Sequence, residues 1–342
     1  MKKILLITII AFASLPLLTS FNDKAEKDKA EKGKAGKDEI ALGKMLFSDP
    51  ILSRDMTISC ASCHIPAFAF ADTAAVSRGV FGRKGKRNSP SAMNVLLRVS
   101  LFWDGRANTL EEQALAPIEN PDEMDLSIDS AIARLTQNKM YYELFQKVYT
   151  APPDKKYLAA AIAAFERTLE TSESPFDDWK FSGDSTAVSA SVKRGFELFS
   201  SKGKCTQCHF GADFTANEFR NIGLFNGIDL NDSGRAMVTK LPGDIGRFKT
   251  PTLRNIELTA PYMHNGMFRT LDEVIDFYND IKSIIPNGLY TDSVLAMPLG
   301  LSAAEKKDIK AFLLSLTDKR FDTANKILNI VENGQQDFIG EY

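Results

Sequence analysis

This chain of 342 residues contains few histidines and cysteines. It also carries little net charge and has few long apolar runs. A net charge of −2 provides no basic surface of the kind that binds nucleic acid, so no nucleic-acid partner is expected. A hydrophobic content of 44% excludes a disordered chain. The length predicts about two domains. Only three histidines and four cysteines are present, so the position of each one is informative.

The apolar run at residues 4–18 is too short to span a bilayer, which takes about 20 residues. Two lysines precede it and Thr19 and Ser20 follow it, which is the arrangement of a secretory signal peptide. A retained anchor or an N-terminal core helix is the alternative. No cysteine lies near the cleavage region to carry a lipid. We therefore expect residues 1–20 to be a signal peptide and the mature chain to be exported to a bacterial periplasm.

Residues 21–38 are predicted to be a charged flexible linker. Positions 23–38 hold only Lys, Glu, Asp, Ala and Gly, and such a tract has no apolar face with which to join a core. We expect the folded part to begin near Glu39. A turn-rich stretch at 174–184 predicts a boundary between an N-terminal domain, 39–176, and a C-terminal domain, 184–342.

Helical periodicity predominates over the alternation typical of strands, so the fold is predicted to be mainly α. Apolar residues recur at helical spacing over 128–150, 157–169, 271–278 and 303–316. Ser302 and Glu305 predict a capping box at the start of the last of these helices.

All four cysteines fall into two copies of a C-x-x-C-H motif. The motif residues are Cys60, Cys63 and His64 in the first copy and Cys205, Cys208 and His209 in the second. This is the attachment signature of c-type haem, in which two thiols form thioethers with the vinyl groups and the histidine is the proximal iron ligand. Export would permit two disulfides instead. A zinc site would need further ligands, and only His264 remains. A redox C-x-x-C has no need of a histidine in both copies.

The two motifs lie about one domain length apart. Each follows a helix-like segment that ends in Leu-Phe, at 44–47 and at 195–199. The sequence therefore predicts two cytochrome c-like domains, each carrying one covalently bound haem c.

Several segments, taken with the two motifs, resemble the bacterial di-haem cytochrome c peroxidase and MauG family. They run from about Leu42 to Leu316 and read LGKMLFSDPILSRDMTISCASCH, GKRNSPSAMN, LFWDGRANTLEEQALAPIENPDEM, CTQCH and FKTPTLRNIELTAPYMHNGMFRTLDEVIDFY. The resemblance implies an oxidoreductase of the cytochrome-c peroxidase type. It also implies a peroxidatic haem in the N-terminal domain and an electron-transfer haem in the C-terminal domain.

The resemblance also implies roles for single residues near the haems. Trp103 matches a tryptophan that relays electrons between them, with a core aromatic residue as the alternative. Gln113 and Glu123 match the polar pair of the peroxide pocket, and Pro117 matches a position that shapes it. O–O cleavage moves a proton between the two oxygens, which a carboxylate can shuttle while an amide orients the substrate. The position of Glu123 in the sequence, taken without the resemblance, predicts a solvent-exposed acidic residue in a loop.

Many members of the family carry an additional histidine after the first motif, which caps the resting N-terminal iron. Residues 77–86 contain no histidine. His64 is the expected ligand of the first iron, so this haem should be high-spin and open on its distal side, without reductive activation. Lys84 or Lys86 is the alternative ligand.

The second iron is expected to have His209 and Tyr278 as ligands. Family peroxidases usually supply a methionine at the position that Tyr278 occupies here, so this feature resembles MauG. A phenolate lowers the potential of a haem iron, whereas methionine raises it. The alternative is a core tyrosine, with Met297 or Met267 as the ligand.

His264 matches a position near the interface of the two haems, where it would bind a haem propionate or backbone. The resemblance also implies a calcium ion at this interface. Asn88, Thr259 and Pro261 match its ligand positions, and hard oxygen ligands suit Ca²⁺.

We therefore expect a periplasmic peroxidase that reduces H₂O₂ to water. Electrons would come from a small cytochrome c or copper protein, through the C-terminal haem and Trp103. One alternative is a MauG-like enzyme that uses high-valent iron to oxidise a partner protein or another substrate. A second alternative is a di-haem electron carrier or sensor, which has no need of Gln113 and Glu123. The family often forms dimers, so the resemblance allows a homodimer.

Overall fold

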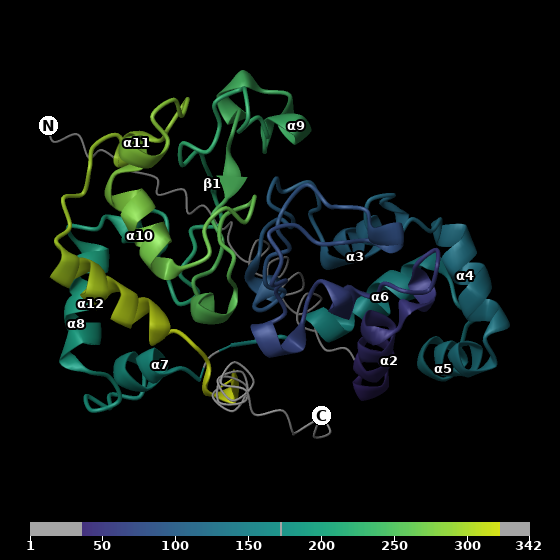
Figure 1. Cartoon of the computed structure of the whole chain (residues 1–342). Coiled ribbons are helices and arrows are strands. Elements are labelled where there is room, and N and C mark those ends of the chain that lie inside the picture. The colour runs from purple at the N-terminus through teal and green to yellow at the C-terminus, as the bar shows by residue number, and fades with distance from the viewer. Residues whose placement is uncertain (1–35, 172, 322–342) are drawn as a thin grey trace, which may run out of the picture.

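The computed structural model describes residues 36–171 and 173–321 of the chain (Figure 1). The expected signal peptide, most of the expected linker and residues 322–342 lie outside these ranges. Most of the regular structure is helical, so the prediction of a mainly α fold is confirmed. No helix in the described ranges is both long enough and apolar enough to cross a membrane.

Five helices form the described part of the N-terminal half. They are α2 (Lys37–Ser48), α3 (Leu110–Glu119), α4 (Ile128–Gln137), α5 (Lys139–Tyr149) and α6 (Lys155–Glu166). The segment between α2 and α3 contains only short 3₁₀ turns, and it carries the first C-x-x-C-H motif and Trp103.

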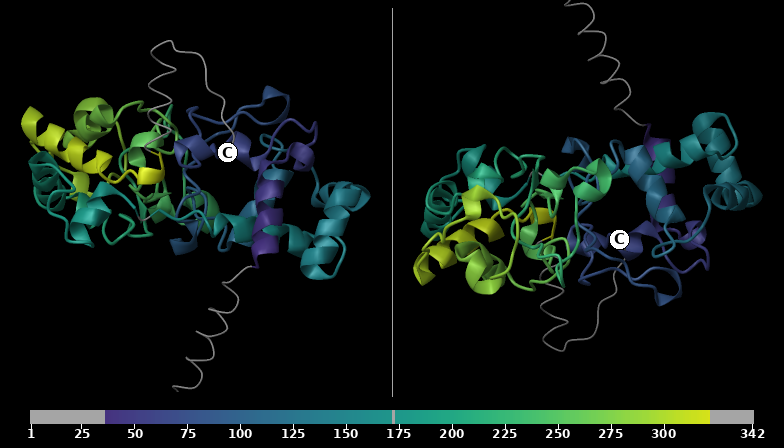
Figure 2. Two further views of the ribbon diagram at one scale, coloured as in Figure 1. Left: turned by 90° about the horizontal axis from the view of Figure 1, so that it is seen from below. Right: turned by 90° about the horizontal axis from the view of Figure 1, so that it is seen from above.

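Between residues 173 and 321, six helices and a short sheet form the C-terminal half. The helices are α7 (Pro175–Lys180), α8 (Ala190–Ser200), α9 (Ala236–Thr239), α10 (Leu271–Asn279), α11 (Ile281–Ile284) and α12 (Ala303–Leu314). Strands β1 (Phe219–Arg220) and β2 (Phe248–Lys249) pair antiparallel, with Phe219 opposite Lys249. The two halves lie side by side in all three views, with irregular segments between them (Figures 1 and 2).

Most expected helices are present, but the one expected over 128–150 is two helices. Asn138 separates α4 from α5, and its side chain accepts a hydrogen bond from the backbone N–H of Tyr141. An asparagine that caps a new helix competes with continuation of the old one, which explains the break. The capping box of Ser302 and Glu305 is confirmed at the start of α12.

The turn-rich stretch at 174–184 contains helix α7, which was not expected. Ser174 and Asp177 form a capping box, and Pro175 occupies the first turn, where its missing N–H has no cost. Phe176 packs in the hydrophobic cluster of the C-terminal half, although the expected boundary placed it in the N-terminal domain. The division into domains stays a prediction.

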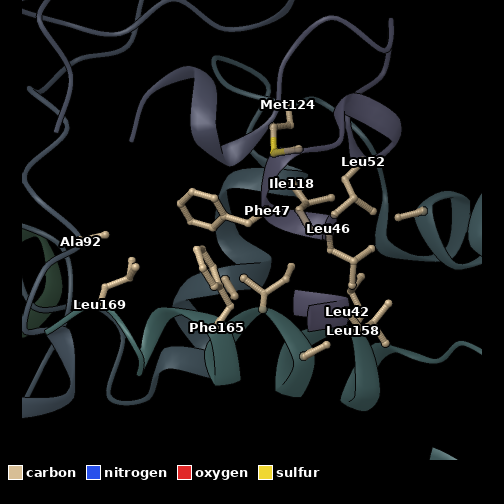
Figure 3. Packing of buried hydrophobic residues seen from close by; sticks show 14 of the residues in the cluster. Leu42, Leu46, Phe47, Leu52, Ala92, Ile118, Met124, Leu158, Phe165 and Leu169 are labelled. Carbon is tan, nitrogen blue, oxygen red and sulfur yellow. The ribbon is translucent and has the colours of Figure 1, made fainter. Parts of the chain in front are cut away.

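Each half has its own hydrophobic cluster. The first is built on α2, α3 and α6, and Figure 3 shows Phe47 and Phe165 facing each other within it. Leu258 and Phe321, from the C-terminal half, also pack in this cluster. The second is built on α8, α10 and α12.

The same helix crossing occurs in both halves. Helix α2 meets α6 at Gly43, where an added Cβ would lie 1.8 Å from the carbonyl oxygen of Ala161. Helix α8 meets α12 at Gly195, where an added Cβ would lie 2.0 Å from the carbonyl oxygen of Asp308. Only glycine lets the two backbones approach so closely in each pair.

The aromatic residues next to these crossings correspond as well. Phe47 follows the first glycine by one helical turn, and its ring lies 5.1 Å from that of Phe165. Phe199 follows the second glycine in the same way, 5.0 Å from the ring of Phe312. Each motif therefore follows the first helix of a structurally similar pair and precedes the second.

Candidate functional site

Both C-x-x-C-H motifs form a tight 3₁₀ turn directly before the histidine. The turns are Cys60–Ser62 and Cys205–Gln207. The backbone N–H of His64 donates to the carbonyl of Cys60 at 2.9 Å, and that of His209 donates to the carbonyl of Cys205 at 2.8 Å. This turn brings the two sulfurs and the imidazole of each motif to one place in the fold.

Each motif histidine is held in the orientation that an iron ligand needs. Nδ1 of His64 lies 3.0 Å from the carbonyl oxygen of Phe70, and Nδ1 of His209 lies 2.9 Å from that of Phe214. Burial lowers the pKa of both imidazoles, which favours the neutral form. Because a carbonyl only accepts, Nδ1 carries the proton and Nε2 is left to bind a metal.

A cavity of about 980 Å³ connects the two motifs. All six motif cysteines and histidines line it, and so do Trp103, Gln113, Glu123 and Tyr278. Volumes of this order are typical of sites for large ligands. The cavity, the free thiols and the fixed imidazoles fit two haems, one at each motif.

Buried cations in the cavity wall fit the carboxylates of a haem. Nη1 of Arg98 is buried and has no hydrogen-bond partner within 36–171 or 173–321. Lys249 lies beside it and donates from Nζ to the carbonyl of Ser100 at 2.7 Å. Burial, and then the charge of Arg98, lowers the pKa of Lys249 to about 7. No sequence pattern distinguishes these two residues from surface lysines and arginines, because their burial depends on distant segments.

Helix α3 and the turn that follows it form one wall of the cavity. Gln113 and Pro117 lie one helical turn apart on α3, and Glu123 lies in the turn after the helix. The side chain of Asn120, the residue that caps α3, donates to Oε1 of Glu123 at 2.7 Å. Burial raises the pKa of Glu123, and the charge of Arg106 opposes this. The structure therefore brings Gln113 and Glu123 to the same cavity, and Asn120 orients the carboxyl group.

Residues 77–86 pack tightly against the turn that carries Glu123. The N–H of Val80 donates to the carbonyl of Glu123 at 2.8 Å. A Cβ added to Gly79 would lie 2.4 Å from that same carbonyl oxygen. Lys84 is exposed outside the cavity, whereas Lys86 is exposed but contributes to its lining.

Trp103 lies at the junction of the two halves and is fixed by hydrogen bonds on both sides. Its indole N–H donates to the carbonyl of Asn88 at 2.8 Å. Its own carbonyl accepts from the N–H of Lys249 at 2.8 Å, on strand β2. The indole lies edge-on to His264, with ring centroids 6.5 Å apart.

His264 is buried, and its ring stacks on Phe248 with the centroids 3.6 Å apart. Burial lowers its pKa, so the imidazole is neutral at ordinary pH. The backbone carbonyl of His264 accepts from the N–H of Asn88 at 2.8 Å, which joins the two halves. The structure places His264 at the haem cavity and next to Trp103.

Tyr278, Met267 and Met297, the candidate ligands of the second iron, lie at different places relative to the cavity. Tyr278 lies on α10 and lines the cavity, and its hydroxyl has no hydrogen bond to any other residue within the described ranges. Met297 is 70% exposed and lies outside the lining. Met267 packs on the second hydrophobic cluster. Of these three side chains, Tyr278 is the one that lines the cavity, and its role as an iron ligand stays a prediction.

The three expected calcium positions come together at the junction and line the cavity. Asn88 uses its side-chain N–H to donate to the carbonyl of Ala74 at 3.1 Å, which leaves its side-chain oxygen unused. In the described part of the chain, the carbonyls of Thr259 and Pro261 accept no hydrogen bond. Free oxygens of this kind fit a Ca²⁺ site, which stays a prediction.

The chain matches a family model described as di-haem cytochrome c peroxidase over residues 37–186. It is 39% identical over 285 residues to the methylamine utilization protein MauG of Methylorubrum extorquens, with 82% of this chain and 78% of that protein covered. It is 38% identical over 250 residues to the cytochrome c551 peroxidase of Nitrosomonas europaea, with 72% and 74% covered. A solved MauG-like protein associated with microbial copper homeostasis matches with a TM-score of 0.78 and 32% identity, over 84% of this chain and 92% of that one.

Proposed function

Because this chain belongs to the di-haem cytochrome c peroxidase and MauG family, we propose that it reduces H₂O₂ to water in the periplasm with electrons from a small redox protein. The observation that carries the proposal is the wall of Gln113 and Glu123 in the same cavity as the first C-x-x-C-H motif. A protein that only carries electrons does not need Gln113 and Glu123 in its haem cavity. The related cytochrome c551 peroxidase supports peroxide as the substrate and a redox protein as the donor.

A haem bound at the first motif supplies an iron that binds peroxide and takes up its oxidising equivalents. The protein then has to move a proton from one peroxide oxygen to the other. Glu123 is suited to this step because burial raises the pKa of its carboxyl group above the ordinary value, which makes it a better proton acceptor. Asn120 holds one carboxyl oxygen, and the amide of Gln113 orients the substrate.

The approach to the first iron stays open because residues 77–86 supply no histidine. Their contacts with the Glu123 turn hold this loop as part of the pocket wall. We therefore infer a high-spin first haem that needs no reductive activation.

A haem held by Cys205, Cys208 and His209 would take up the donor's electrons, and Trp103 would relay them to the haem at the first motif. The support is the position of the indole at the junction, bonded to Asn88 and in edge-on contact with His264. A calcium ion held by Asn88, Thr259 and Pro261 would stiffen the same junction. The donor we propose is a small cytochrome c or copper protein.

A MauG-like activity on a partner protein or another substrate is the second candidate. The observation that favours it is Tyr278, which lines the cavity near the second motif and whose hydroxyl has no hydrogen-bond partner among the described residues. An anionic oxygen ligand stabilises higher oxidation states of iron, which suits a reaction that stores oxidising power.

Steady-state oxidation of a reduced cytochrome c by H₂O₂ tests the proposal. In the holoenzyme, Glu123→Gln should lower kcat/KM for peroxide by about a hundredfold, the lower end of what a positioned proton shuttle contributes. The matched control is Glu119→Gln, on the exposed end of α3 outside the cavity, which should retain full activity.

An unchanged rate in Glu123→Gln would contradict the role of Glu123. Slow donor oxidation by the wild type, with a long-lived oxidised state of the protein after peroxide, would favour the MauG-like candidate instead.

A further inference from the structure

Glu166 is a buried carboxyl group in the wall of the haem cavity. It is the last residue of α6 and is only 6% exposed. The other buried residues of this helix are all Ala, Leu, Ile or Phe. Ile162, one turn earlier on the same face, also lines the cavity. The helix thus presents one acid to the cavity from an otherwise apolar side.

The carboxyl group of Glu166 lacks the partners that a buried carboxylate needs. Its Oε2 is fully buried and has no hydrogen-bond partner within the described residues. The neighbouring Arg167 is turned away and binds Glu111 of α3 at 2.6 Å. A buried charge without a partner is costly, so the group neutralises by binding a proton.

The electrostatic surroundings favour the protonated acid. Burial raises the pKa of Glu166 to about 8, Arg167 lowers it, and Glu111 on α3 raises it. The carboxyl terminus of a helix is also unfavourable for a negative charge. Glu166 in turn interacts with the thiol of Cys60, in the first motif.

Glu166 and Glu123 belong to the same haem site. Burial raises the pKa of the Cys60 thiol, and Glu166 and then Glu123 raise it further. Both carboxyl groups therefore lie within electrostatic reach of one sulfur. Helix α6 packs against α3, the helix that carries Gln113. Two acids thus reach the first haem site, from different elements and with different surroundings.

We propose that Glu166 is a second proton donor for the peroxide pocket, in an inference that rests on the proposed peroxidase function. Reduction of H₂O₂ to two molecules of water consumes two electrons, which the redox donor supplies, and two protons. Glu123 only moves a proton that the peroxide already carries. Glu166 supplies a new one: its O–H bond breaks, and the proton passes through cavity water to the oxygen that stays behind after O–O cleavage and becomes the second water. Solvent supplies the second proton and then restores the acid.

The pH profile of the holoenzyme tests this role. Wild-type kcat/KM for peroxide should fall as the pH rises through about 8, because the acid form is the active one. Glu166→Gln should be about a hundredfold slower at pH 7 and should not show this fall. Glu119→Gln is the matched control, since Glu119 is an exposed carboxylate of α3 outside the cavity, and it should keep the wild-type profile.

Infrared spectroscopy of the resting holoprotein gives a readout that does not depend on activity. The wild type should show the C=O stretch of a protonated carboxyl group that disappears as the pH rises through about 8. The band should be absent in Glu166→Gln and present in Glu119→Gln. Unchanged haem absorption in both variants shows that they fold and carry haem.

A Glu166→Gln variant with the wild-type rate and profile, or with the carboxyl band intact, would overturn the proposal. Wild-type protein without peroxide turnover would instead defeat the proposed function, and the infrared titration would still report the state of Glu166.

Discussion

Two tyrosines line the haem cavity, and their hydroxyl groups have different environments. Tyr262 donates from its hydroxyl to the carbonyl of Ile256 at 3.0 Å. Tyr278 has no such partner within the described ranges, although burial raises its pKa above the ordinary value. A phenol placed in this way is suited to bind a metal, because coordination supplies the interaction that the protein does not.

Removal of the Tyr278 hydroxyl should change the second haem. In Tyr278→Phe we expect a different visible absorption and EPR spectrum and a higher midpoint potential, because an anionic ligand that lowers the potential is lost. Spectra and potentiometric titration of the holoprotein measure this. Tyr262→Phe removes a hydroxyl from the same cavity and should leave the second haem unchanged. Identical spectra for Tyr278→Phe and the wild type would exclude it as a ligand.

At the scale of single residues, the sequence identified those that belong to short motifs or to family segments. It did not identify Asn120, Arg98, Lys249 or Glu166. Their roles depend on burial and on partners far along the chain. Lys249, for example, meets the carbonyl of Ser100, 149 positions away. No local pattern separates such a residue from an ordinary surface charge.

At the scale of elements, the periodicity of apolar side chains and the capping residues at helix ends were sufficient to predict most helices. The capping box of Ser302 and Glu305 is an example, because both of its partners lie within one turn. Asn138 shows where this reasoning fails, since the apolar spacing continues across it while the backbone does not. The crossings at Gly43 and Gly195 were also missed, because they depend on which helix lies opposite.

Because of these crossings, we expect that neither Gly43 nor Gly195 can be replaced by a residue with a side chain without loss of stability. Gly43→Ala and Gly195→Ala should each lower the free energy of unfolding by about 1–3 kcal/mol or more, because the methyl group would overlap a backbone carbonyl that cannot move aside. Denaturant unfolding of the holoprotein measures the loss. Gly243→Ala is the control, because an added Cβ there meets nothing within 4 Å. Wild-type stability in both crossing variants would show that the helices are further apart than described.

At the scale of the whole molecule, polar contacts join the two halves around Trp103. Arg87 binds Asp104 of its own half at 2.7 Å and makes a two-pronged ion pair with Asp232 at 2.6 and 2.8 Å. Arg235 donates to the carbonyls of Asp104 and Gly105 at 2.9 and 2.8 Å. The turn after Trp103 is thus held by the C-terminal half. The sequence predicted the tryptophan but not this support, because the contacts span more than 100 residues.

The Arg235 contacts predict that electron delivery depends on a residue outside the cavity. Gly105 has φ +68°, and an added Cβ would lie 2.3 Å from the ring of Phe219 and 2.8 Å from Arg235, so the turn fits closely against both. Arg235→Gln removes the donor from two carbonyls and loosens the turn. Since a displacement of about 1 Å can cost up to a hundredfold in rate, we expect electron transfer from the second haem to slow by roughly tenfold.

Stopped-flow mixing of the reduced protein with one equivalent of H₂O₂ measures this step as the oxidation rate of the second haem. The first reaction of peroxide at the other haem should keep its wild-type rate, because Arg235 touches neither Gln113 nor Glu123. Trp103→Phe removes the relay itself and shows how far the electron-transfer rate then falls. Arg235→Gln should show part of that decrease in rate. Arg194→Gln breaks an exposed pair with Asp308, away from the junction, and should have no effect. Wild-type electron transfer in Arg235→Gln, alongside a large loss in Trp103→Phe, would show that the indole keeps its position without support from the C-terminal half.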